Sequence, residues 1–267
     1  MGGDSTVAPT PGAVADHPAV VEVVLRVVGA ALHILATLAI VHRLDPEATG
    51  IYFRGFVIAC GLAAFIRGKY ELYMAHHLIG GRILASGVAD GALLLQLGRR
   101  VLLRASLVCG ALLVVTADLD IQTPRLQPTL ETYLPFVLAI PCVSISTFIG
   151  EALRAANRTL LGTVITAYSL NICILLAVAL APPEAPLFFY SWAFLVGSFL
   201  ASVVAVLLAS RAFPAEWNSG WQPIGRKVLH KADQRALVAI ARAALFWGPL
   251  CVLAIAAPAA FSSGFRH

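Results

Sequence analysis

Charged residues are scarce in this sequence. Lys, Arg, Asp and Glu together make up 12% of its 267 residues, whereas hydrophobic residues make up 59% and the mean hydropathy is +0.85. A soluble globular domain has about 25% charged and about 45 to 50% apolar residues. The composition therefore excludes a soluble domain and indicates an integral membrane protein.

The common signatures of enzymes and metal sites are also missing. The chain has no Gly-rich phosphate loop followed by Lys, no HExxH and no GxSxG. Its five cysteines are isolated within apolar segments, without the spacing of a metal site or a disulfide framework. We therefore expect a protein that is not an enzyme and that holds no metal and no cofactor. The cysteines are predicted to be small core residues: Cys60, Cys109, Cys142, Cys173 and Cys251.

Long apolar runs separated by short polar loops dominate the chain. This pattern is typical of a helical bundle, because the strands of a membrane barrel alternate apolar and polar residues in segments of about ten. We predict an all-α integral membrane protein with about seven transmembrane helices. The predicted spans are 19–41, 50–66, 101–117, 132–153, 159–181, 187–210 and 237–260.

The net charge of +5 is a topology signal rather than a sign of nucleic-acid binding, because the basic residues lie in loops between spans. Before the C-terminal tail, the loops opposite the N-terminus contain only Arg43 and Arg125 as basic residues, together with six acidic residues. By the positive-inside rule, the N-terminus is predicted to be cytoplasmic. The loops on its side contain Arg67, Lys69, Arg82, Arg99, Arg100, Arg104, Arg154, Arg158, Arg211, Arg226, Lys227, Lys231, Arg235 and Arg242.

Two cytoplasmic connections and one helix differ from the simple pattern. Residues 70–100 are interrupted by glycines and are predicted to form a connection with an interfacial amphipathic helix. Residues 213–235 contain two tryptophans and a basic run and are predicted to lie at headgroup level. The fourth span contains Pro135 and Pro141, which favour a kink that either lines a cavity or only adjusts packing.

The first span carries an ionisable stripe. At 100° per residue, Glu22, Arg26 and His33 fall within about 40° of one another. A charged side chain at mid-membrane costs at least about 2.5 kcal/mol, so the stripe should face a wet cavity or a partner.

Two interpretations of the stripe remain open. Glu22 and Arg26 form a simple ion pair at i,i+4 near the cytoplasmic end. Alternatively, Arg26 and Arg54 contribute to a cationic cavity for an anionic substrate, since guanidinium groups bind phosphate oxygens in a bidentate way. Arg26 is predicted near the inner face of the membrane and Arg54 near the outer face.

Three short segments resemble a known family. Arg26-Val27-Val28-Gly29 and the turn Leu44-Asp45-Pro46-Glu47-Ala48-Thr49-Gly50-Ile51-Tyr52 are similar to the opening of the O-antigen-type oligosaccharide flippases. These polysaccharide-biosynthesis proteins belong to the multidrug/oligosaccharidyl-lipid/polysaccharide (MATE-like) superfamily. Asp45 stands where that family usually has glycine. Glu151-Ala152-Leu153-Arg154-Ala155-Ala156-Asn157-Arg158 resembles the polar segment that follows its fourth helix.

The resemblance implies a flippase that moves a polyprenyl-pyrophosphate-linked oligosaccharide across the bacterial inner membrane for surface polysaccharide and lipopolysaccharide biosynthesis. It carries Arg26 over as a substrate-binding residue, and Arg54 only through its place on the second helix. It allows coupling to an ion gradient through Glu22 or His33. The implied partners are the lipid-linked oligosaccharide, membrane lipids and a second transporter half, with no nucleic acid.

The resemblance also divides the chain. Residues 1–17 are predicted to be a disordered cytoplasmic tail, and 18–211 a six-helix lobe that resembles one half of a MATE-like transporter. Residues 212–236 are predicted to be a cytoplasmic connection, and 237–267 the truncated start of a second lobe. Because that superfamily transports by rocking two lobes, a single lobe is not expected to transport alone.

Other functions stay open from the sequence. A cation-coupled multidrug exporter of the same superfamily would need a buried carboxylate, and Glu22 is the only acid in the early spans. A membrane-embedded glycan transferase or polymerase would need a large external loop with catalytic arginines or histidines, and the sequence predicts none. Asp118-Leu119-Asp120 resembles the DxD motif of glycosyltransferases but lies in a short external loop. A membrane scaffold without transport is the fourth candidate.

Overall fold

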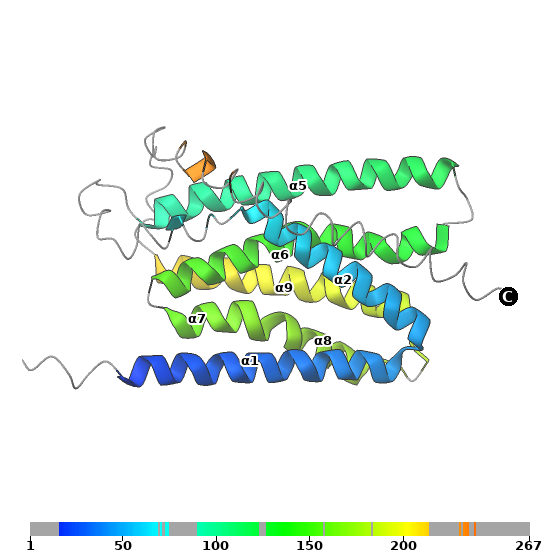
Figure 1. The fold of residues 1–267 in the computed structure, drawn as a ribbon, viewed down its shortest axis with the longest axis horizontal. Coiled ribbons are helices and arrows are strands. Elements are labelled where there is room, and N and C mark those ends of the chain that lie inside the picture. The colour runs from blue at the N-terminus through cyan, green and yellow to red at the C-terminus, as the bar shows by residue number, and fades with distance from the viewer. Residues whose placement is uncertain are drawn as a thin grey trace, which may run out of the picture.

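The computed structural model describes residues 16–68, 70, 73–74, 90–122, 127–156, 158–182, 184–213, 230, 232–234 and 238. Within these ranges the regular structure is helical, without strands, and the predicted all-α fold is confirmed (Figure 1). The elements are α1 (Asp16–Arg43), α2 (Pro46–Arg67), α5 (Asp90–Gln122), α6 (Gln127–Ala155), α7 (Thr159–Thr163), the π-helical segment η2 (Val164–Ser169), α8 (Leu170–Leu180) and α9 (Leu187–Ala212).

Within the described ranges, five helical segments are long and apolar enough to cross a membrane, so the chain is a multi-pass membrane protein. They are Val20–Arg43, Pro46–Arg67, Thr132–Ala155, Thr159–Leu180 and Leu187–Ala212. These segments coincide with the first, second, fourth, fifth and sixth predicted spans. The third predicted span lies within α5, which is not one of the five. The seventh, 237–260, lies outside the described residues.

Helix α6 is the centre of the bundle. It packs most extensively against α9, then against α5 and α2. Of the residues in its apolar 18-residue stretch, 67% are buried. It is continuous across both prolines, Pro135 and Pro141. Helix α1 lies at the edge of the bundle, along α7, η2 and α8 (Figure 1). Only 17% of the residues in its apolar 18-residue stretch are buried. Most of the apolar surface of α1 therefore faces away from the described part of the bundle.

Aromatic side chains join α6 to α2 and α9. Phe136 of α6 lies between Tyr52 and Phe194, with ring centroids 5.3 and 5.1 Å apart. All three side chains are buried. Gly55 lets α2 approach this cluster, because a Cβ atom there would lie 2.5 Å from the Phe136 ring. The cluster fixes the relative positions of the three helices.

The prediction of a separate interfacial helix within residues 70–100 was wrong for its last part. Residues 90–100 form the first turns of α5, and Ala92, Leu93, Leu94 and Leu97 are buried. They belong to a hydrophobic cluster that includes Phe148 of α6. The tertiary contacts extend the helix because this apolar face has a partner, which local hydropathy does not reveal.

The turn between the first two spans is shorter than predicted. Only Leu44 and Asp45 separate α1 from α2, whereas the sequence placed 42–50 in the turn. The Asp45 carboxylate accepts a hydrogen bond of 2.7 Å from the backbone N–H of Ala48, and Pro46 begins the helix. A capping aspartate followed by proline is a strong helix start. This part of the family-like motif therefore has a local structural role.

The cap predicts how variants at Asp45 behave. Asp45→Ala is expected to lower the free energy of unfolding by about 0.5–2 kcal/mol, because it leaves an orphan N–H at the helix start. Asp45→Gly, the residue usual in the similar family, is expected to cost only a few tenths of a kcal/mol. Thermal unfolding in detergent checks both variants. Equal losses for the two would contradict a capping role.

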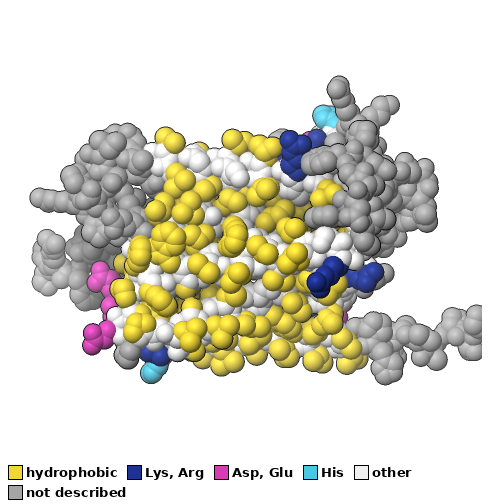
Figure 2. Space-filling model, turned by 180° about the vertical axis from the view of Figure 1, so that it is seen from behind, with side chains coloured by type: hydrophobic (Ala, Val, Ile, Leu, Met, Phe, Trp, Pro, Cys, Tyr) yellow, Lys and Arg dark blue, Asp and Glu magenta, His cyan; other side chains and the backbone are white. Residues whose placement is uncertain are grey.

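The two ends of the bundle differ in charge. One end, here called the basic end, is where α1 and α5 begin and where α6 and α9 end (Figure 1). Arg154 and Arg211 lie in the last turns of α6 and α9, Arg158 directly precedes α7, and Arg99 and Arg100 lie in the first three turns of α5. The opposite, acidic end contains Asp45, Glu47 and Glu184, together with Arg43. Figure 2 shows a broad hydrophobic face between acidic side chains at one end and most of the basic side chains at the other.

Candidate functional site

The ionisable stripe of α1 lies along the edge of its packed face. Gly29, beside the stripe, is buried against η2, and a Cβ atom there would lie 2.6 Å from the Cβ atom of Ala167. Tyr168 of η2 donates a hydrogen bond of 2.8 Å to the backbone carbonyl of Leu25. This close approach leaves Arg26 and His33 on the border between buried and open surface, where polar groups remain accessible.

Arg26 and Glu22 form an ion pair between Nη2 and Oε1. The Arg26 side chain is 62% exposed and that of Glu22 37% exposed. The ion pair considered from the sequence is therefore present. Because the guanidinium group stays accessible, the pair also leaves Arg26 able to contact a ligand.

Arg54 is exposed on α2, and the structure does not bring it to Arg26. With a rise of about 1.5 Å per residue, Arg26 lies about 26 Å from the end of α1, and Arg54 about 12 Å from the start of α2. Both distances are counted from the acidic end, where the turn joins the helices (Figure 1). The two arginines thus lie at different distances from the turn, and one phosphate group is too small to contact both at the same time.

His33 faces a small pocket between α1, α2 and α8. Its Nδ1 atom lies 3.2 Å from Oδ1 of Asn171, and its ring centroid lies 6.0 Å from that of Phe56. The Asn171 amide donates a further hydrogen bond of 2.7 Å to the backbone carbonyl of Ala167 in η2. Asn171 thereby holds the imidazole next to the irregular part of the helix.

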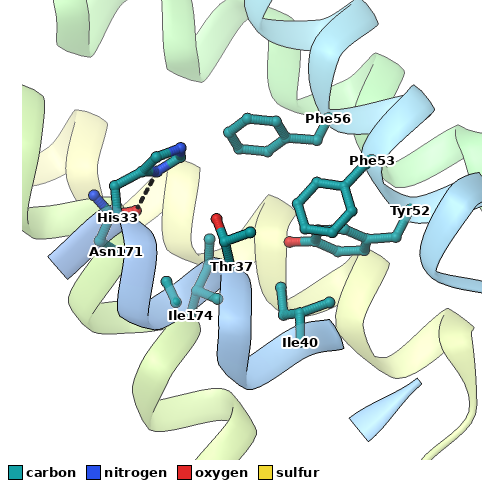
Figure 3. Close-up of a pocket in the computed structure, with 9 residues that line it drawn as sticks. His33, Thr37, Ile40, Tyr52, Phe53, Phe56, Asn171 and Ile174 are labelled. Atoms are coloured by element: carbon teal, nitrogen blue, oxygen red, sulfur yellow. Dashed lines mark hydrogen bonds between the residues drawn. The ribbon is translucent and has the colours of Figure 1, made fainter. Parts of the chain in front are cut away.

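Figure 3 shows the hydroxyl of Tyr52 pointing toward Thr37 at this pocket. The hydroxyl is buried and has no hydrogen-bond partner within the described part of the chain. The cavity, which His33 also lines, has a volume of about 10 Å³. This is room for about one water molecule. The pocket suits a bound water, and is too small for a lipid head group.

The sequence did not predict η2, Tyr168 or the partner of His33. Asn171 is the only amide in the apolar run of α8 and was the available signal for a polar contact. The π-helical turn had no such signal; two of its residues, Ala167 and Tyr168, lie against Gly29 of α1. Such turns are frequent at functional sites.

The polar segment after the fourth span lies at the basic end. Arg154 Nη1 donates to Glu151 Oε1 at 2.8 Å, and its Nε atom is buried without a partner in the described ranges. Across all the residues that the structure describes, no group of three or more His, Cys, Asp or Glu could hold a metal ion. Cys60, Cys109, Cys142 and Cys173 are free thiols, and Cys251 lies outside the described residues.

Comparisons of the chain with protein-family models, with curated proteins and with solved structures gave no match.

Proposed function

We propose that this chain forms one lobe of a bacterial flippase that moves a polyprenyl-pyrophosphate-linked oligosaccharide across the inner membrane. The observation that carries the proposal is an accessible guanidinium group, Arg26, on a membrane-spanning helix at the edge of the bundle. The resemblance of the segments around Arg26 and the α1–α2 turn supplies the substrate class.

The chemistry of the stripe supports an anionic ligand. A pyrophosphate group carries more charge than the Glu22 carboxylate and accepts two parallel hydrogen bonds from one guanidinium group. It can therefore compete with Glu22 for Arg26. Arg54, at a different depth, would meet the head group at another stage of its passage. His33 and Glu22 remain the candidates for ion coupling.

The charge difference between the ends supports an orientation. Arginines gather at the basic end, which also contains the start of α1. Cytoplasmic loops carry an excess of Lys and Arg. The proposed protein thus has its N-terminus in the cytoplasm, and Arg26 lies in the half of the membrane where a lipid-linked oligosaccharide is assembled.

Binding of a lipid-linked pyrophosphate tests this function without requiring a second lobe. The chain in nanodiscs is expected to bind a polyprenyl-pyrophosphate oligosaccharide, and polyprenyl alcohol of the same length is expected not to compete. A pyrophosphate group at an arginine contributes about 1.5–3 kcal/mol, so the affinities should differ by about tenfold or more. Equal competition by the alcohol would show that the chain recognises only the apolar tail.

A further inference from the structure

A second cluster of arginines lies at the basic end, away from α1. Arg100 Nη1 contacts Asp233 Oδ2, and Arg104 Nη2 lies 3.1 Å from Asp233 Oδ1. The hydroxyl of Tyr70 donates a hydrogen bond to the same Oδ1 atom. Three donors from two separate segments thus converge on one carboxylate, which comes from a third segment more than 120 residues further along the chain.

The donors are held in place by apolar packing. Tyr70 is fully buried, and the Arg104 guanidinium carbon lies 4.9 Å from the centre of its ring. Tyr70 belongs to the same hydrophobic cluster as Leu97 and Val101 of α5. Arg100 and Arg104 are one helical turn apart and share a face of α5. The three donors therefore form a framework, here called the cradle, that packing maintains beside Asp233.

The cradle has unused capacity for an anion. Two guanidinium groups face one carboxylate, so the cluster keeps one net positive charge. Arg104 Nη1 is buried and has no hydrogen-bond partner in the described ranges. The side chains of Arg100, Arg104 and Asp233 are about one third exposed, at 34%, 33% and 32%. An ion from solution can therefore reach a site that a single carboxylate does not fill.

Asp233 remains ionised in this setting. Burial raises the pKa of its carboxyl group, but hydrogen bonds from Tyr70 and Arg100 and the charges of Arg100 and Arg104 lower it by more. The pKa therefore lies below the usual range for aspartate. At neutral pH the group is a permanent anion that can be exchanged only for another anion.

We propose that the cradle of Tyr70, Arg100 and Arg104 is a binding site for a phosphate or pyrophosphate group, and that Asp233 occupies it as an exchangeable internal anion. A phosphate group has more acceptor oxygens than a carboxylate, so it can also bind the unpaired Arg104 Nη1. An anionic lipid head group and a free pyrophosphate offer the same chemistry. The site uses different residues from Arg26 and does not rest on the proposed transport function.

Titration of the full chain with inorganic pyrophosphate, in nanodiscs of phosphatidylcholine, tests the site. Asp233→Asn removes the internal anion and is expected to tighten binding by about tenfold or more, as for hydrogen bonds to a charged group. Glu151→Gln is the matched control, because it removes one negative charge beside an arginine at the same end. This control is expected to leave the affinity unchanged.

A second substitution shows whether the cradle itself binds the anion. Arg104→Gln in the Asp233→Asn background is expected to return the affinity to that of the unaltered chain or below it. Thermal unfolding in the same nanodiscs monitors folding, and Asp233→Ser, which also removes the carboxylate, replaces Asp233→Asn if that variant does not fold. The proposal is overturned if removing the carboxylate does not tighten binding, or if Arg104→Gln leaves the tightened binding intact.

The lipid composition distinguishes the two sources of phosphate. If head groups fill the cradle, nanodiscs containing phosphatidylglycerol will weaken pyrophosphate binding to the Asp233→Asn chain, but not to the chain that also carries Arg104→Gln. If the ligand is a free phosphate, phosphatidylglycerol will have the same small effect on both chains. Both outcomes support the site and identify the ligand that fills it.

Discussion

Arg26→Ala is expected to abolish export of the surface glycan in a bacterial strain that lacks its own flippase, while the amount of protein in the membrane stays normal. The test compares the variant with the unaltered chain, each expressed together with the second lobe that the proposed function requires. Arg26 is an accessible cation in the half of α1 nearer the basic end, and without it the pyrophosphate group would enter the membrane from that end without a compensating charge. Surface glycan and membrane-protein levels, measured in the same cells, check the prediction.

The loss should come from function rather than from folding. The Arg26–Glu22 pair lies within one helix, so it holds no two helices together. Helix α1 is about 42 Å long, about 12 Å longer than the hydrocarbon core, so a centred helix places Glu22 near headgroup level. Removing the pair therefore costs little, and the variant protein should accumulate normally.

Two further variants separate charge from geometry. Arg26→Lys keeps the charge but loses the planar fork, so it should retain only part of the export. Arg158→Ala removes an exposed arginine from the same end of the bundle, outside α1, and should export normally. Full complementation by Arg26→Ala would exclude Arg26 from the mechanism.

Gly162→Ala is expected to destabilise the protein by about 1–3 kcal/mol, the usual cost of overpacking. A Cβ atom at Gly162 would lie 2.5 Å from the backbone oxygen of Gly150 and 3.1 Å from the backbone N of Arg154. Neither atom can move without shifting α6. Alanine is favoured over glycine in a helix by about 1 kcal/mol, so the clash must outweigh that gain.

Thermal unfolding in nanodiscs measures this effect, with about 2–4 °C expected per kcal/mol for a domain of 150–250 residues. Gly61→Ala is the matched control: nothing lies within 4 Å of its added Cβ atom, and it should hold or raise the melting temperature. An unchanged melting temperature for Gly162→Ala would mean that α6 and α7 are further apart than the structure has them.

Local patterns predicted much of the fold. The apolar runs placed five of the membrane-spanning helices within a few residues, since length and hydropathy are properties of each segment alone. The spacing of Glu22, Arg26 and His33 likewise predicted a shared stripe, because helical geometry depends only on residue number. Residue number and helical rise likewise place Arg26 and Arg54 at different distances from the α1–α2 turn.

Contacts between segments far apart in the chain could not be predicted from the sequence. Helical periodicity shows which face is apolar, but not which helix covers it, so residues 90–100 were assigned to a separate interfacial segment instead of α5. Ala232 and Asp233 were assigned to a surface connection, yet Ala232 is buried and Asp233 pairs with α5.

The sequence by itself therefore determined that this is a helical membrane protein, where five of its spans run, and at which end of the bundle arginines collect. Only the tertiary structure decided which charged and polar groups meet: Asn171 with His33, and Asp233 with the cradle. The physical reason is that hydropathy and helical periodicity act over a few turns of chain. A contact between side chains more than 100 residues apart depends on how all the helices between them pack.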